Sequence, residues 1–336
     1  MVEMSFFWGK TSRIIVALLI FLFSGSVAFS EDNQGKSFNP GDMIMHHVTD
    51  AHEWHIWDGA FGTIPLPIII YSEKSGLDVF LSSRFEHGHA SYNGYKFDDE
   101  GHLVAEDGRS FIDFSITKNV AQLLINVAFI LFIFIKIAGQ YKKREGKAPK
   151  GLQSLFEPII IYVRDEIVKP NIGPKYEKYL PYLLSLFFFI WIGNLVGLTP
   201  GAANLTGNIS VTGVLALFTL ILTLFSSRKY FWGHIFWPPG VPLPIKPIII
   251  AVELIGIFTK PFSLMIRLFV AITAGHIVLL SLIGLTFIFH SWIVGFGSTM
   301  VVLFINLIEL LVATIQAYVF TLFSSMYIGM AMEEHH

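Results

Sequence analysis

The chain carries five apolar blocks long enough to cross a lipid bilayer, and this feature limits its fold more than any other. A helix rises 1.5 Å per residue, so about 20 apolar residues span a hydrocarbon core about 30 Å thick. The blocks cover about residues 119–139, 179–198, 209–225, 248–289 and 292–332. The last two exceed what an upright span needs, so we expect them to be long and tilted or bent. The sequence predicts an all-α integral membrane protein with five transmembrane helices.

Composition supports this class and excludes others. Of 336 residues, 53% are hydrophobic and only 14% are charged, and the mean hydropathy is +0.61. A disordered chain or a water-soluble domain does not have this balance, and membrane lipid is the expected surrounding. A formal net charge of −2 gives no general attraction to nucleic acid. The absence of cysteine excludes disulfides, thiolate-bound zinc, iron–sulfur clusters and thiol catalysis.

The N-terminus resembles a secretory signal. Lys10 and Arg13 precede a short apolar run at 14–23, and Ala28-Phe29-Ser30 places small residues at a cleavage site. We predict a signal peptide over residues 1–30; the alternative is an uncleaved anchor helix. Residues 31–117 then form a His-rich domain outside the cytoplasm. Segments 77–81 and 112–116 are typical of short strands, so this small domain is expected to contain some β structure.

Basic residues give the membrane domain, 118–336, a direction. Lysines and arginines gather in the links after the first and third blocks, whereas links 199–208 and 290–291 have none. Basic links lie on the cytoplasmic side, so the N-terminal domain faces the periplasm and the C-terminus the cytoplasm of a bacterial inner membrane. Within the first basic link, residues 152–168 have the spacing of an amphipathic surface helix, which we expect Pro170 to end.

Ionisable and amide side chains occur inside the last two blocks, where a charge costs ~3 to ~10 kcal/mol and usually serves a pathway or a partner. The set comprises Glu253, Lys260, Arg267, His276, Glu309 and Gln316. Arg267 is flanked by apolar residues and cannot relay protons, because its pKa stays above about 12. It can act as a fixed positive charge. The alternative is an ion pair within this chain, with Glu309 or Glu253.

Helix geometry groups these side chains. If the last two blocks are antiparallel neighbours with Arg267 level with Gln316, His276 lies ~13.5 Å and Glu309 ~10.5 Å toward the outside, so the two meet. Glu253 then lies ~21 Å toward the cytoplasm. Two titratable groups separated by a permanent cation suit two aqueous half-paths that must not connect. The alternatives are a core role for His276, bonded to a backbone carbonyl, and a purely interhelical bond for Gln316.

At these residues the sequence resembles the a subunit of the F-type ATP synthase, closely from about residue 253 to the C-terminus. The similarity rests on the following residues: Glu253, Lys260-Pro261-Phe262-Ser263, Arg267-Leu268-Phe269, Ala274-Gly275-His276, Gln316-Ala317-Tyr318-Val319-Phe320 and the tail from Ser325 to Ala331. Gly193-Asn194-Leu195, Asn204 and Asn208 match more loosely. Residues 31–117 do not match.

The resemblance implies a non-catalytic subunit that conducts protons past a rotating ring of c subunits. Arg267 would face the ring carboxylate, and Glu253 would line the cytoplasmic half-channel. His276 and Glu309 would form the outer relay. In the enterobacterial version the two residue types are exchanged: the carboxylate follows Ala-Gly and the histidine lies on the last helix. Gln316 belongs to the same set, and Lys260, Ser263, Asn204 and Asn208 would support it. Ala271 departs from the Asn that many members carry there.

The same resemblance implies the b-subunit stator and the remaining ATP synthase subunits as further partners. The chain has no GxxxxGK[ST] segment, so it has no ATP site of that type, and no cofactor is expected.

Two other functions remain open. His46, His47, His52 and His55 lie within ten residues and are weak candidates for metal ligands, so a metal-handling membrane protein is one alternative. His52-Glu53-Trp54-His55 is one residue too short for the HExxH zinc motif. The second alternative function is a stand-alone ion exchanger. It would need its own transport site, usually with inverted repeats that this sequence lacks.

Overall fold

The computed structural model describes residues 41, 49–55, 62–73, 75–85, 90–98, 101–143, 146–199, 201–238, 240–289 and 291–332. The predicted signal peptide, His46 and His47 lie outside the described residues, and so does the side chain of His55. The chain divides into two compact units. The first contains Met1–Leu124, Val196–Ala203 and Ile277–Leu307, and the second contains Ile125–Leu195, Asn204–His276 and Ile308–His336.

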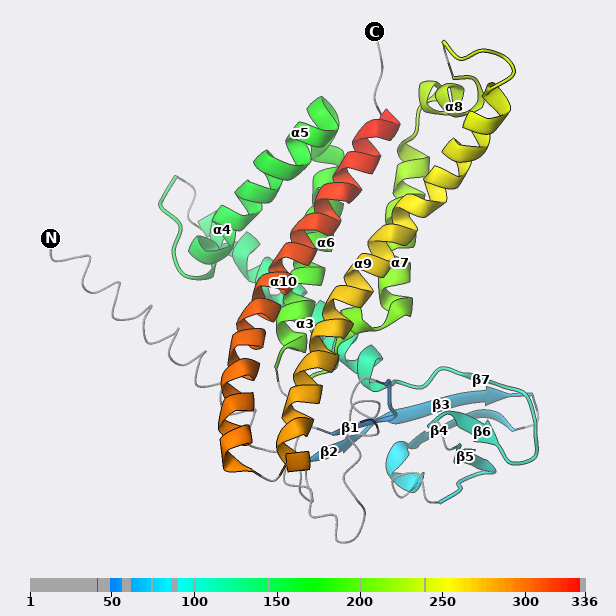
Figure 1. The fold of residues 1–336 in the computed structure, drawn as a ribbon, viewed down its shortest axis with the longest axis vertical. Helices are drawn as coiled ribbons and strands as arrows, with labels where there is room; N and C mark the ends of the chain where they lie inside the picture. Colours follow the sequence, from blue (N-terminus) through cyan, green and yellow to red (C-terminus); the bar gives the residue numbers. More distant parts are fainter. Residues whose placement is uncertain are drawn as a thin grey trace, which may run out of the picture. The chain divides into compact units, whose positions relative to one another are not determined.

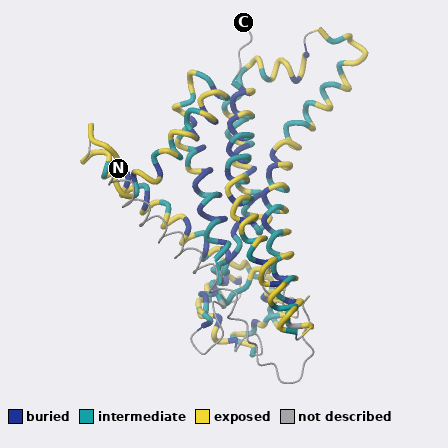
Figure 2. Tube along the Cα trace, turned by 60° about the vertical axis from the view of Figure 1, so that its left-hand side comes forward, coloured by how far each residue is buried: buried dark blue, intermediate teal, exposed yellow. Residues whose placement is uncertain are grey.

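Long apolar helices dominate the described part of the chain (Figure 1). Five candidate membrane spans confirm the predicted fold class. They lie in α3 Lys118–Lys143, α6 Tyr176–Gly197, α7 Ile209–Ser226, α9 Lys246–Phe289 and α10 Trp292–Met332, and the second, Leu152–Gly197, also includes the helical segment before α6. A short helix, α8 Lys229–Phe236, was not predicted. Exposed residues, yellow in Figure 2, recur along the long helices, as expected of surfaces that meet lipid.

The amphipathic segment differs from the prediction at its end. Helix α4 Leu152–Tyr162 continues through a π-helical stretch, Val163–Val168, into α5 Lys169–Ile172. At the end of the π stretch the N–H of Lys169 donates to the carbonyl of Arg164, five residues back. Pro170 therefore falls in the first turn of α5, where its missing N–H is tolerated. The helix turns at Gly173, whose φ is 74°, so the predicted end at Pro170 is wrong.

The N-terminal domain, part of the first unit, contains short antiparallel strands. The central sheet has the order β4-β3-β7, with β3 Pro67–Ser72, β4 Gly76–Leu81 and β7 Phe111–Asp113. Two-stranded pairs accompany it: β1 Glu53–His55 with β2 Thr63–Pro65, and β5 Tyr95–Phe97 with β6 Leu103–Ala105. The strand predicted at 77–81 is confirmed as β4, and the one predicted at 112–116 is confirmed in part, because β7 ends at Asp113.

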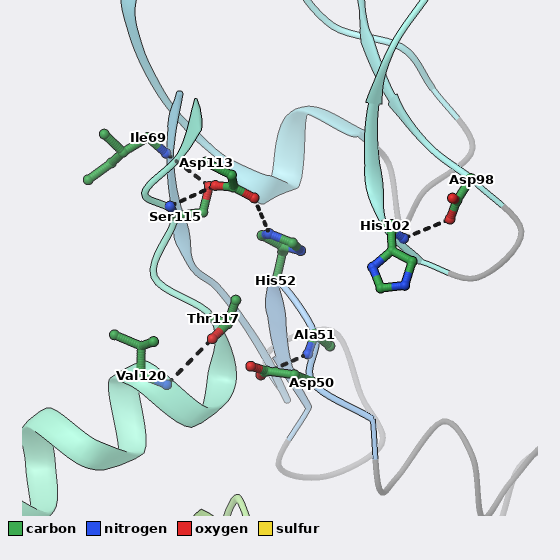
Figure 3. A network of polar contacts seen from close by, with 10 residues as sticks. All are labelled: Asp50, Ala51, His52, Ile69, Asp98, His102, Asp113, Ser115, Thr117 and Val120. Atoms are coloured by element: carbon green, nitrogen blue, oxygen red, sulfur yellow. Dashed lines mark hydrogen bonds and ion pairs between the residues drawn. The ribbon is translucent and has the colours of Figure 1, made fainter. Parts of the chain in front are cut away.

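One face of the central sheet forms the domain core. The core residues are Ile68, Ile70, Phe85, Tyr95 and Leu103. Beside it, the Nε2 of His52 lies 3.6 Å from the Oδ2 of Asp113 (Figure 3). The N–H of Ser115 donates to the Oδ1 of the same carboxylate at 2.7 Å. Burial alone would raise the pKa of Asp113, but the contacts from His52 and Ser115 outweigh it and hold that pKa below its ordinary value.

In the second unit, small residues allow α10 to pack closely against its neighbours. Ala313, Ala317, Ser324 and Ala331 are fully or almost fully buried along one side of the helix. At Gly329, an added Cβ would overlap the backbone carbonyl oxygen of Asn171. Close approach of this kind is how helices associate where lipid removes the hydrophobic driving force.

Candidate functional site

Arg267 is an exposed cation at the middle of an apolar helix. Twenty-one residues of α9 precede it, so it lies about 32 Å along the helix from the nearer end and cannot reach water by extending its side chain. Its guanidinium carbon lies 4.7 Å from the centre of the Phe323 ring. Within the described residues, no carboxylate forms a salt bridge with it, so the alternative of an ion pair with Glu253 or Glu309 is not formed here.

The aromatic residues under Arg267 were missed by sequence reasoning. Phe323 and Tyr327 stack with their ring centres 6.1 Å apart, and the Nζ of Lys260 lies 5.7 Å from the Tyr327 ring. Side chains on a helix lean toward its N-terminus, so Arg267 leans down α9 toward the later residues of the antiparallel α10. The available signal was the pair of aromatics four residues apart that follows Gln316.

Glu309 is the buried acid of the site. It is 8% exposed, and neither carboxyl oxygen has a hydrogen-bond partner among the described residues. A Cβ added at Gly275 would lie 2.5 Å from Oε1, so the carboxyl group rests directly against the α9 backbone. This contact differs by one residue from the predicted register of Arg267 with Gln316. It places Glu309 beside the residue that precedes His276.

The other predicted site residues are less buried than Glu309. Glu253, His276 and Gln316 are half-buried, while Lys260 and Ser263 are exposed. No described hydrogen bond or ion pair joins Glu253 to Arg267. Asn204 and Asn208 have local structural partners: their side chains accept from the N–H groups of Gly207 at 3.0 Å and Ser210 at 2.9 Å. Asn208 thereby caps α7.

Hydrogen bonds hold the part of α10 that lies between Glu309 and Gln316. The hydroxyl of Thr206 donates to the Oδ1 of Asn194 at 2.6 Å, and the Nδ2 of Asn194 donates to the carbonyl of Ala313 at 3.4 Å. Trp191 adds a bond from its indole N–H to the hydroxyl of Thr314 at 3.2 Å. Such interhelical bonds hold the register of α6 against α10 within the second unit.

The weak metal candidates are not gathered by the structure. His52 contacts Asp113, and among the described residues no three His, Cys, Asp or Glu side chains lie together as metal ligands. His46 and His47, and the side chain of His55, are outside the described part.

The geometry therefore offers a fixed charge and a buried proton-binding group on two antiparallel helices. An unpaired guanidinium exposed on an apolar helix favours an anionic partner supplied from outside the chain. A buried carboxyl group without hydrogen-bond partners is costly, and such groups in membrane helices usually serve transport.

Comparison with known proteins gives two family matches. Residues 121–329 match the family described as ATP synthase A chain, and residues 43–122 match a domain of unknown function, DUF8433. Three similar relatives are each named ATP synthase subunit a. The protein from Chloroherpeton thalassium is 43% identical over 260 residues, which cover 74% of this chain and 77% of the relative. Those from Pelodictyon phaeoclathratiforme and Chlorobium phaeobacteroides (strain DSM 266) are 42% and 40% identical; each match covers 88% of this chain, and 78% and 77% of the relative.

Proposed function

Because the chain belongs to the ATP synthase A chain family, we propose that it is the proton-conducting stator subunit of an F-type ATP synthase Fo sector. The observation that carries this proposal is the exposed Arg267 at the middle of α9, which forms no ion pair within the described part of the chain. In this role the guanidinium faces the carboxylate of a rotating ring of c subunits. It attracts the ionised carboxylate and disfavours a proton crossing in its place.

Protons reach and leave the ring through two half-channels. Glu253 lines the cytoplasmic one, on the N-terminal side of Arg267 along α9. His276 and Glu309 form the relay of the periplasmic one, and Gln316 lies between the levels of Glu309 and Phe323 on α10. The packing of Glu309 against Gly275 supports this pairing, because it brings the acid to the turn of α9 that carries His276.

The energy that this arrangement handles is modest per proton. One elementary charge crossing 100 mV releases about 2.3 kcal/mol, and this becomes rotation only if the proton must travel with the ring. If protons passed directly from one half-channel to the other, this energy would be released without rotation. A permanent positive charge between the two paths opposes that passage, and arginine suits this role because it does not give up its proton.

The test is Arg267→Ala in membranes that contain the whole ATP synthase. We expect the subunit to assemble, as judged by cross-links to the c ring, while ATP-driven proton pumping is lost. Lys136→Ala is the matched control, since Lys136 is a cation of span α3 that also lies over a ring, 5.5 Å from Phe132. Control membranes should pump normally. Coupled pumping at the normal rate in Arg267→Ala would contradict the proposed role.

A further inference from the structure

The second face of the central sheet of the N-terminal domain carries aliphatic and aromatic side chains, most of them exposed. In the antiparallel register, Tyr71 opposes Leu77 and Ile112, and Ile69 opposes Val79. Pairing continues past β7, because Phe114 and Ile116 donate their N–H groups to the carbonyls of Ile69 and Pro67. Cross-strand partners share a face. The outer face thus has three rows of three: Leu77, Val79 and Leu81; Pro67, Ile69 and Tyr71; Ile112, Phe114 and Ile116.

No charged residue occupies this face, which we name the outer sheet face. Six of its side chains are 46–64% exposed: Tyr71, Leu77, Val79, Leu81, Ile112 and Phe114. The opposite face of the same sheet forms the buried core of the domain. An antiparallel sheet of a soluble domain normally presents polar side chains on the face away from its core, so this face is built to meet an apolar environment.

The third row leads directly into a membrane span. Only Thr117 separates Ile116 from Lys118, where α3 begins, and two residue steps reach at most about 7 Å. The first turns of α3 expose Val120 and Leu124. The end of the third row is therefore tethered within about 7 Å of the point where the chain enters the bilayer. Whichever way the sheet turns, the Ile116 end of the third row stays near the level of the interface, whereas Ile112, six residues before Lys118, reaches that level only if the strand lies along the membrane.

The size of the outer sheet face favours lipid over a protein partner. Three strands about 4.8 Å apart, with five residues each, cover roughly 300 Å² once side-chain width is included. A stable protein interface needs about 800 Å² on each partner. A small apolar face can still enter a bilayer that its own chain already spans, because the tether replaces most of the cost of association.

We propose that the outer sheet face lies in the interfacial region of the lipid leaflet at which α3 begins. The N-terminal domain is then a monotopic element that rests on the membrane, with Tyr71 and Phe114 at the level of the headgroups. This inference depends on α3 spanning the membrane and not on the proton path. Failure of one proposal therefore leaves the other standing.

The absence of native cysteine allows a direct test. Nitroxide labels are placed by Val79→Cys and Ile112→Cys, on two strands of the face, in the full-length chain in nanodiscs of phosphatidylcholine and phosphatidylglycerol. Lys96→Cys, an exposed position on β5 outside the face, is the matched control. Relaxation by oxygen, which concentrates in hydrocarbon, is compared with relaxation by a water-soluble nickel chelate.

We expect the ratio of oxygen to nickel accessibility to be several-fold higher at positions 79 and 112 than at position 96. Equal ratios at all three would overturn the proposal, because the face would then lie in water. Labels hidden from both reagents in nanodiscs would overturn it in favour of a cover from this chain or a second copy. Labels open to nickel in the isolated chain and hidden only in the complete ATP synthase would replace lipid with a partner subunit.

Discussion

At the scale of single residues, Gly275 and Glu309 share one small volume. The glycine has no side chain where the glutamate places its carboxyl group, and an added Cβ would also lie 3.2 Å from Cδ of Glu309. The acid is a long side chain with free torsions, so it can move aside without displacing either backbone. A change at Gly275 is therefore expected to act on the position of the acid more than on the fold.

Gly275→Ala should slow proton transport while the subunit still folds and assembles. The added methyl pushes the carboxyl group away from the turn that carries His276, and relays are sensitive to such displacements. Proton uptake into membrane vesicles measures the effect. Gly256→Ala on the same helix is the control, because nothing lies within 4 Å of its added Cβ. Equal rates in the two variants would mean that the position of Glu309 does not limit transport.

The proposed relay makes a second prediction. His276→Ala and Glu309→Gln should each slow pumping, and the double variant should lose less than the two effects summed, since each change breaks the same step. Rates of ATP-driven proton uptake complete the cycle. Fully additive losses, expressed as activation free energies, would show that the two residues act independently.

Asp113 predicts an acid limit for the N-terminal domain. Its pKa is lowered in the folded state, so its contribution to stability is present above the unfolded value of about 3.9 and is lost as pH falls through the lowered folded pKa. The protection factors of amides in β3 and β7, which correct for the intrinsic slowing of exchange in acid, should therefore fall below about pH 4, and Asp113→Asn should reduce this pH dependence. Asp107→Asn, at an exposed acid beside Arg109, should leave the profile unchanged.

At the scale of elements, α10 owes its position to small residues and buried hydrogen bonds. The hydroxyl groups of Thr219 and Ser324 are 3.3 Å apart. Asn194, on α6, donates a hydrogen bond to the carbonyl of Ala313. Serine, alanine and glycine on the packed side let neighbouring backbones come close, and these hydrogen bonds pair some of the polar atoms that lie away from water.

Gly329→Ala should destabilise this packing. The added Cβ would overlap the Asn171 carbonyl, and backbone cannot yield as a side-chain end does. Overpacking of this kind costs about 1–3 kcal/mol or more. Thermal unfolding of the purified subunit in detergent should show a lower midpoint than the native chain. Gly297→Ala on α10, with open space around its added Cβ, should keep the native midpoint.

Apolar length was sufficient to predict most helices. The predicted blocks at 248–289 and 292–332 correspond to α9 and α10, because a long, mostly apolar run has no stable alternative to helix in lipid. The end of the amphipathic segment was not predictable in the same way. It depended on a π-helical change of register before Pro170, and the signal for such a change is tertiary.

At the scale of the whole molecule, the predicted topology can be checked with single cysteines. Asp107→Cys, in the N-terminal domain, should react with an impermeant maleimide added to intact spheroplasts. Lys142→Cys, at the end of α3, should react only after the membrane is opened. Labelling of both from outside, or the reverse pattern, would contradict a periplasmic N-terminal domain.

Much of the candidate site could be predicted from charge alone. Arg267 and Glu309 are visible in the sequence because ionisable groups in apolar blocks are costly. The aromatic support of Arg267 and the contact of Glu309 with Gly275 required the direction in which side chains leave two antiparallel helices. The outer sheet face also required structure, since its third row is completed by strand pairing across more than forty residues.

The shared space at Gly275 also limits how this protein can vary. A larger side chain at position 275 requires a smaller one at position 309, and the reverse, so neither residue can be exchanged freely for a larger one. In an alignment of related chains the pair should therefore covary, with glycine kept wherever the facing residue is long and polar. Bulk at 275 is expected to accompany a short side chain at 309.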